Sequence, residues 1–154
     1  MQRSHSTPVS RAGALAALGG SMLVVASMFM PWVDRGSSRS LDYWHISGVD
    51  GFAGDQGTWR MSVVLIPLLV LWCALYFVWR SNESRLAWAF GGFSGAMMLY
   101  GGDLRISSDL PSGSGGAGEL VAAVGLLLLL LGCAFAVAGN VAEPNRTATP
   151  AKGR

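Results

Sequence analysis

Residues 118–139 read GELVAAVGLLLLLLGCAFAVAG, and this stretch decides the fold class. Its one charge, Glu119, lies in the first turn, and six consecutive leucines occupy residues 126–131. At 1.5 Å per helical residue the stretch reaches roughly 33 Å. The hydrocarbon core of a bilayer is about 30 Å thick. The stretch therefore predicts a transmembrane helix.

Three weaker apolar runs precede it, at residues 12–31, 61–79 and 86–102. The first run is about 19 residues long, and the apolar part of a signal peptide is usually about 7–15 residues long. We therefore expect a retained helix there. The third run contains five glycines and is therefore less apolar. The charges on either side of it are consistent with the other spans only if it crosses the membrane. The sequence thus predicts an all-α membrane protein, a bundle of four transmembrane helices.

The composition excludes several other classes of protein. The chain is 51% hydrophobic and 13% charged, whereas soluble domains carry about 25% charged residues. A net charge of +2, without a basic stripe, argues against a nucleic-acid partner. Cys73 and Cys133 lie inside apolar runs, so we interpret them as small buried side chains and not as a disulfide.

The spans divide the chain into three parts. Residues 1–11 form an N-terminal segment, residues 12–139 form the four-helix domain with its last span at 118–139, and residues 140–154 form a polar tail that we expect to be disordered. The first outer loop, residues 33–59, has 27 residues and several glycines. Aromatic and β-branched residues at 41–49 favour one short strand or hairpin arm within this loop.

The basic residues give the predicted orientation. Four crossings place both termini on one side, which then carries seven basic residues, whereas the other side carries four. Positive residues remain cytoplasmic, so we expect a multi-pass protein of the cell membrane with both termini in the cytoplasm. The abundance of Arg, Ala and Gly indicates a bacterial source with a GC-rich genome.

Small residues at spacings of three and four predict where the helices contact each other. In lipid the hydrophobic effect does not drive helices together, so their association depends on close backbone approach, which small residues permit. We expect spans one, three and four to make the tight core and span two to lie at its rim. Leucine at Gly95 or Gly125 should then disrupt folding more than leucine at Ala74. The residues that we expect at helix contacts are Gly91, Gly95, Gly118, Ala122, Gly125, Gly132 and Ala136.

The spans hold no ionisable residue between their ends, which argues against a pump, a coupled transporter and an intramembrane hydrolase. We therefore expect no enzymatic activity, no cofactor and no metal. In the outer loop Asp42, His45, Asp50 and Asp55 are the candidate metal ligands, and a site needs three or four of suitable geometry. Asp42 and His45 would share a face only in a helix, and the nearby glycines argue against one.

Aromatic residues of the outer loop leave two interpretations open. They form an apolar patch for a partner protein, or they lie on the lipid headgroup layer, as aromatic residues commonly do. A third interpretation is an outward sensor that uses His45. The candidate interaction residues of the loop are Tyr43, Trp44, His45 and Phe52.

Several short motifs carry a resemblance to a known group of proteins. They are FMPW at 29–32, SGVDG at 47–51, and Leu99-Tyr100 followed by Arg105. With the leucine-rich last span, this layout is similar to uncharacterised small four-helix integral membrane proteins of actinobacteria-like bacteria. The resemblance covers most of residues 12–139 and implies no activity.

Two functions are consistent with these features. The first is a non-enzymatic accessory or interaction subunit of the bacterial cell envelope, whose outer loops meet a partner. The alternative is a small oligomeric channel or transport component. The expected partners are the lipid bilayer and either a second copy of the chain or another membrane protein, with no nucleic acid.

Overall fold

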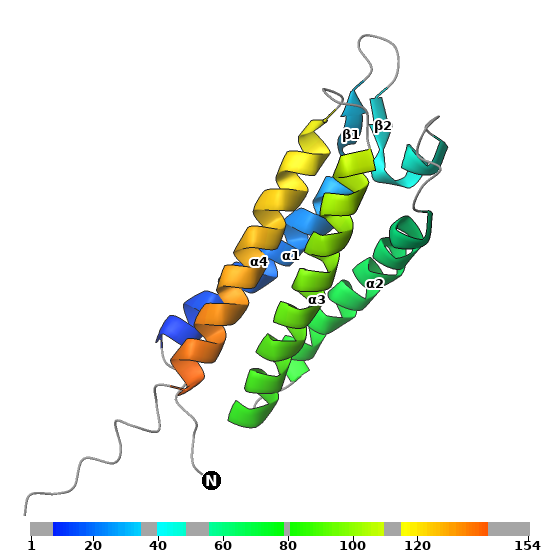
Figure 1. Cartoon of the computed structure of the whole chain (residues 1–154). Helices are drawn as coiled ribbons and strands as arrows, with labels where there is room; N and C mark the ends of the chain where they lie inside the picture. Colours follow the sequence, from blue (N-terminus) through cyan, green and yellow to red (C-terminus); the bar gives the residue numbers. More distant parts are fainter. Residues whose placement is uncertain (1–7, 35–39, 49–55, 79–80, 110–114, 142–154) are drawn as a thin grey trace, which may run out of the picture.

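Four helices run side by side with alternating direction in the computed structural model, which describes residues 8–34, 40–48, 56–78, 81–109 and 115–141 (Figure 1). Two short strands and a 3₁₀ helix cover one end of the helices, here named the hairpin end. The opposite end holds the start of α1 and the end of α4 and is named the terminal end. The elements are α1 (Pro8–Ser27), β1 (Pro31–Asp34), β2 (Ser40–Asp42), η1 (Tyr43–Gly48), α2 (Gln56–Val78), α3 (Asn82–Asp109) and α4 (Ala117–Val141).

Three helical segments are long and apolar enough to cross a membrane, namely α1, residues 60–78 of α2, and α4. This finding confirms the prediction of a helical chain with membrane-compatible segments. At 28 residues α3 is the longest helix, but five glycines and the charged residues near its two ends make it less apolar.

The first helix differs from its predicted limits at both ends. It begins at Pro8, where a proline suits the first helical turn because its missing N–H has no helical partner there. It ends at Ser27 instead of reaching Pro31. Met28, Phe29 and Met30 donate to carbonyl groups three residues earlier, at 3.1–3.3 Å, because Pro31 disfavours helical geometry in the residue before it.

The other helices are also longer than their apolar cores. α3 extends beyond the predicted 86–102 to residues 82–109. α4 continues through Asn140, which the sequence predicts to lie in the polar tail. Asn140 is buried, accepts a hydrogen bond from the Ser10 hydroxyl at 3.3 Å and donates to the Ala136 carbonyl at 2.9 Å. This contact joins the start of α1 to the end of α4.

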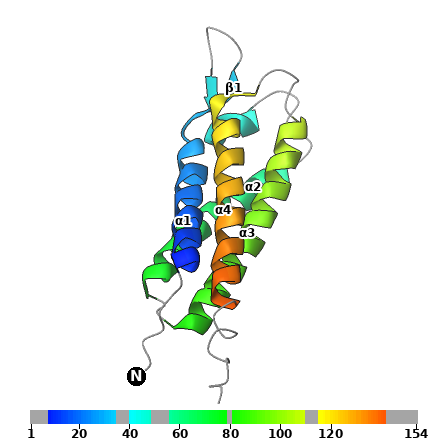
Figure 2. The same ribbon diagram turned by 90° about the vertical axis from the view of Figure 1, so that its left-hand side faces the viewer.

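α1 and α4 form the tightest helix pair. A Cβ atom placed on Gly13 would lie 2.6 Å from the Ala136 nitrogen, and one on Gly132 would lie 2.7 Å from the Gly13 carbonyl oxygen. Gly20 and Gly125 approach each other in the same way. The two backbones are therefore in direct contact, as small residues permit in a membrane. Figure 2 shows α4 between α1 and α3.

On α3 the predicted contact glycines lie elsewhere. Gly91 is exposed, and a Cβ atom on Gly95 would meet no atom within 4 Å. The glycine that another helix covers is Gly92, against the indole of Trp72. The prediction for Gly91 and Gly95 was wrong for two reasons. Gly91 lies on the exposed side of α3. Gly95 shares a helix face with Trp88 and Gly92, but no neighbouring residue fills the space beside it.

Two small residues near the start of α4, Gly118 and Ala122, contact the hairpin end. A Cβ atom on Gly118 would lie 2.5 Å from the Trp32 ring and 2.9 Å from the Ser27 carbonyl oxygen. Gly118 thus makes room for a tryptophan as well as for the end of α1. Ala122 is buried in a second apolar cluster that includes Met28, Trp32 and Ile106.

α2 is the least buried of the three membrane-compatible segments, and its main neighbour is α3. Trp72 on α2 and Trp88 on α3 stack with ring centroids 4.2 Å apart and planes at 6°. Each indole N–H donates to the other tryptophan's carbonyl oxygen, at 2.8 and 2.9 Å. This Trp72–Trp88 pair joins the two helices near the terminal end.

Candidate functional site

A small folded unit, named the cap, covers the hairpin end and consists of β1, β2 and η1. The strands are antiparallel and pair Val33 with Leu41 and Asp34 with Ser40, with an irregularity between Pro31 and Val33. The predicted strand at 41–49 is present only at its start, because β2 ends at Asp42 and η1 follows. Asp42 caps η1 by accepting the backbone N–H of His45 at 3.1 Å.

Backbone hydrogen bonds attach the cap to the helices. The Gly116 N–H, just before α4, donates to the Trp32 carbonyl at 2.8 Å, and the Tyr43 N–H donates to the Met28 carbonyl at 3.3 Å. Val33 and Ile46 are fully buried beneath the cap. Because buried apolar side chains and backbone bonds act together, the cap and the helix ends form one packed unit.

Two aromatic side chains of the cap point inward. Trp32 is 3% exposed and donates its indole N–H to the Ser27 carbonyl at 2.8 Å. Tyr43 is also 3% exposed, packs edge-on against Trp32 at 4.8 Å between ring centroids, and shares a hydrogen bond with Ser62 of α2. The cap therefore contacts α1 and α2 through polar as well as apolar groups.

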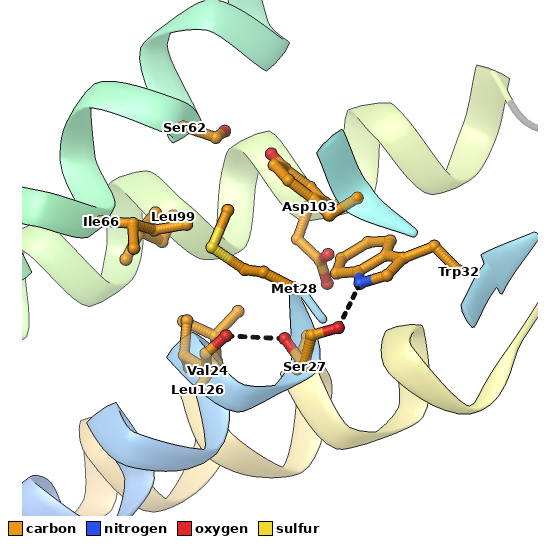
Figure 3. A pocket seen from close by; sticks show the side chains of 11 residues that line it. Val24, Ser27, Met28, Trp32, Ser62, Ile66, Leu99, Asp103 and Leu126 are labelled. Atoms are coloured by element: carbon orange, nitrogen blue, oxygen red, sulfur yellow. Dashed lines mark hydrogen bonds between the residues drawn. The ribbon is translucent and has the colours of Figure 1, made fainter. Parts of the chain in front are cut away.

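Beneath these rings lies a cavity of about 30 Å³, here named the cap cavity. A space of about 10–15 Å³ is enough for one water molecule, so one or two waters fit. Asp103 extends from α3 into the cavity beside the Trp32 indole, and Ser62 enters it from α2 (Figure 3). The lining residues are Val24, Ser27, Met28, Trp32, Tyr43, Ser62, Ile66, Leu99, Asp103, Ala122 and Leu126.

Asp103 is the charged group of this cavity, one residue beyond the predicted third span. Burial, and secondly the nearby Glu119 carboxylate, raise the pKa of Asp103 from 3.8 to about 6. Burial also raises the pKa of Tyr43 to about 12, so this phenol stays neutral. The sequence does not single out Asp103, because it lies just outside the predicted span at residues 86–102, whereas α3 continues to Asp109.

We expect the folded protein to become more stable as the pH falls from neutral toward about 4. Asp103 has a higher pKa in the folded than in the unfolded chain, so the folded state binds its proton more tightly. This contribution is complete below the unfolded pKa of 3.8 and disappears as the pH rises through about 6. Asp103→Asn should remove that part of the pH dependence, as measured by thermal unfolding in detergent. Glu83→Gln, an exposed acid at the terminal end, should leave it unchanged, and an unaltered profile in Asp103→Asn would contradict the assignment.

The candidate loop residues do not form one surface. Tyr43 is buried, contrary to the expectation that it lies on an interaction patch, whereas Trp44 is 37% exposed. The residue that joins Trp44 is Phe29, 69% exposed, with ring centroids 6.2 Å apart. Phe52 lies outside the described residues. Phe29, in the turn between α1 and β1, and Trp44 of the cap therefore form an exposed aromatic pair at the hairpin end.

Asp42 and His45 lie together, because η1 is a 3₁₀ helix and brings residues three apart onto one face. The Asp42 carboxylate contacts the His45 ring nitrogen Nδ1 at 2.5 Å. The expectation that the glycines would prevent a shared face was wrong. Within the described parts of the chain no three His, Cys, Asp or Glu side chains gather as metal ligands, and Asp50 and Asp55 lie outside them. Cys73 and Cys133 are free thiols.

The hairpin end thus has buried aromatic rings that line a small cavity, and an exposed aromatic pair. They do not bring a nucleophile, a general base and an oxyanion donor together within the described residues. No protein-family model, no curated protein and no solved structure matches this chain. The resemblance to four-helix membrane proteins of actinobacteria-like bacteria stays a prediction.

Proposed function

We propose that the protein is a non-enzymatic accessory or interaction subunit of the bacterial cell envelope, which presents its cap to a partner at the membrane surface. The observation that carries this proposal is the exposed Phe29–Trp44 pair at the hairpin end, where buried side chains hold the cap against the helices. Exposed aromatic residues on a rigid support suit protein interfaces, where they add contact area at little cost in conformational entropy.

The proposed topology has four spans. α1, α2 and α4 have the composition of membrane spans. α2 runs from the hairpin end to the terminal end, and α4 starts again at the hairpin end (Figure 1). If these helices cross, α3 has to return across the bilayer between them. The excess of basic residues at the terminal end then supports cytoplasmic termini and an outward cap in the cell membrane.

Labelling of one added cysteine with a membrane-impermeant, photoactivatable maleimide tests both the orientation and the partner. Ser40 is exposed on β2 of the cap, and Glu83 is exposed at the start of α3 at the terminal end. In intact cells we expect Ser40→Cys to be labelled and Glu83→Cys to be labelled only after the membrane is opened. Cys73 and Cys133 lie inside the helices, so the unmodified chain gives the background.

Irradiation of the labelled Ser40→Cys protein should yield one discrete protein adduct, and the adduct should weaken when Trp44→Ala is added. Adducts with lipid alone would show that the aromatic pair lies on the headgroup layer and would contradict the partner proposal. Labelling of Glu83→Cys in intact cells would instead contradict the orientation.

A further inference from the structure

The α2–α3 contact opens toward the hairpin end. The Trp72–Trp88 pair closes it near the terminal end, and beyond this pair two neighbouring cavities of about 170 and 280 Å³ follow, with Leu65 lining both. We name this space the lateral groove. Leucines of α2 and glycines of α3 provide most of its lining.

Three glycines of α3 leave bare backbone in the floor of the lateral groove. Cβ atoms placed on Gly95 and Gly101 would meet no atom within 4 Å, and the nearest atom to one on Gly91 would be 3.9 Å away. These glycines differ from Gly13, Gly20 and Gly132, whose Cβ positions are already occupied by the backbone of another helix. Apolar walls without contact partners forfeit dispersion energy, so a flexible apolar chain that fills the groove is favoured.

The length of the lateral groove fits one leaflet. From Gly91 to Arg105, α3 rises about 21 Å at 1.5 Å per residue, whereas half of a hydrocarbon core is about 15 Å. The groove therefore spans the depth of an acyl chain and ends near the level of the headgroup.

The mouth of the lateral groove is basic and polar. Arg105 and Ser62 line the cavity nearest the hairpin end, and Arg105 is the one charged residue among the described residues that line the groove. Arg60 is exposed at the same end of α2. Asp103, two residues from Arg105, lines the cap cavity instead. A guanidinium group at this position suits a phosphate group, which it can bind with two parallel hydrogen bonds.

A second groove provides an internal comparison. The cavity between α1 and α2 measures about 270 Å³ and is lined by Ser21, Met22, Val25, Ala26, Leu69, Val70 and Cys73. It is similar in size to the larger cavity of the lateral groove, but none of these lining residues is charged. A neutral acyl chain would fit it, whereas nothing in its lining favours an anionic headgroup.

We propose that the lateral groove binds an anionic phospholipid, with one acyl chain on the glycines of α3 and the phosphate on Arg105. The proposal rests on the proposed insertion of the chain in a membrane. It gives the glycines at 91, 95 and 101 a role that helix packing within the chain does not use.

Native mass spectrometry of the full chain in mild detergent, titrated with phosphatidylglycerol or phosphatidylcholine, tests this site. We expect phosphatidylglycerol to bind about tenfold more tightly, which corresponds to about 1.4 kcal/mol. Arg105→Gln should abolish this preference, whereas Arg11→Gln, which removes a charge near the terminal end, should keep it. Gly95→Leu should weaken the binding of both lipids by filling the groove, and Gly19→Leu, an equally open glycine on α1, should not.

Three outcomes would overturn the proposal. Equal affinity for the two lipids would remove the role of Arg105, and equal losses in Arg11→Gln and Arg105→Gln would mean diffuse charge attraction. A dimer that Gly95→Leu dissociates would mean that a second copy of the chain occupies the groove. Thermal unfolding of each variant shows that it is folded. Resistance of the unmodified chain to alkaline extraction from membranes reports membrane insertion separately, so failure of the lipid site and failure of the proposed topology can be told apart.

Discussion

Leucine in place of Gly20 is expected to prevent α1 and α4 from packing, whereas leucine in place of the neighbouring Gly19 should leave the fold intact. A Cβ atom on Gly20 would lie 2.5 Å from both the Gly125 carbonyl oxygen and the Leu129 nitrogen. A Cβ atom on Gly19 would meet nothing within 4 Å. The two variants add the same side chain to adjacent residues of one helix, so helix propensity and hydrophobicity are matched.

The expected effect of Gly20→Leu is large because the atoms in the way belong to the backbone. Overpacking a core usually costs about 1–3 kcal/mol, since side chains can shift to other rotamers. Here the whole of α4 has to move. Exposure of the separated helix surfaces to lipid has no hydrophobic cost, so nothing opposes their separation. We therefore expect a loss above about 3 kcal/mol, a major part of the usual total of about 5–15 kcal/mol.

Thermal unfolding in one detergent, followed by circular dichroism, measures this difference. Gly20→Leu should either aggregate or lose roughly 10 °C or more in Tm, and Gly19→Leu should match the unmodified chain. Gly125→Leu should behave like Gly20→Leu, and Gly95→Leu like Gly19→Leu, because the Cβ position is blocked at Gly125 and open at Gly95. Equal Tm values for the Gly19 and Gly20 variants would refute close backbone contact between α1 and α4.

The contact face of α4 could be predicted from sequence because its small residues follow the helical period and its large residues do not. Gly125, Gly132 and Ala136 are buried against α1, on the stripe that the spacing indicates. A repeat of this kind specifies one face of a helix, whatever the neighbour is. Local pattern was therefore sufficient there.

The contact face of α3 could not be predicted in the same way, because α3 has small residues on more than one side. Gly91 and Gly95 follow the four-residue spacing that is typical of helix contacts, but the Trp72 ring packs against Gly92. That choice depends on a partner side chain on another helix, and no spacing within α3 encodes it. The regular pattern marks the open groove instead of the packed face.

The cap illustrates a second limit of sequence reasoning. A strand at 41–49 would place Tyr43 and Ile46 on opposite faces, since side chains alternate along a strand. The 3₁₀ helix places residues three apart on the same face, and both side chains are buried there. The Asp42 cap favours this turn, but a short aromatic stretch carries signals for strand and turn alike.

Trp88→Ala is expected to release α2 from the other helices. Trp88 is 1% exposed and stacks on Trp72, and the pair exchanges two hydrogen bonds between indole N–H and backbone carbonyl groups. Tyr76 packs against Trp88 at 4.9 Å between ring centroids. Removing a buried tryptophan ring costs about 3–5 kcal/mol. Because α2 has little contact with α1, no other helix compensates for the loss.

Phenylalanine at the same position separates the two contributions of the Trp72–Trp88 pair. Trp88→Phe keeps an aromatic ring but removes the N–H that donates to the Trp72 carbonyl, which should cost about 0.5–1.5 kcal/mol. Trp44→Ala, at an exposed tryptophan of the cap, should change the free energy of unfolding by no more than about 0.5 kcal/mol. Near-ultraviolet circular dichroism should lose the signal of the stacked indoles in both Trp88 variants and keep it in Trp44→Ala.

A double-mutant cycle shows whether the two tryptophans act as one unit. Each indole holds the other in register, so once Trp88→Phe has loosened the pair, Trp72→Phe should cost less than it does alone. Residues in direct contact show coupling energies of about 0.5–3 kcal/mol, and we expect a value within this range. Gly92→Leu, which would displace the Trp72 ring, should weaken the same contact while both indoles remain in the chain. Additive losses in the cycle, with an unchanged indole signal in Gly92→Leu, would mean that α2 is held by its leucines and that the Trp72–Trp88 pair contributes only ordinary apolar area.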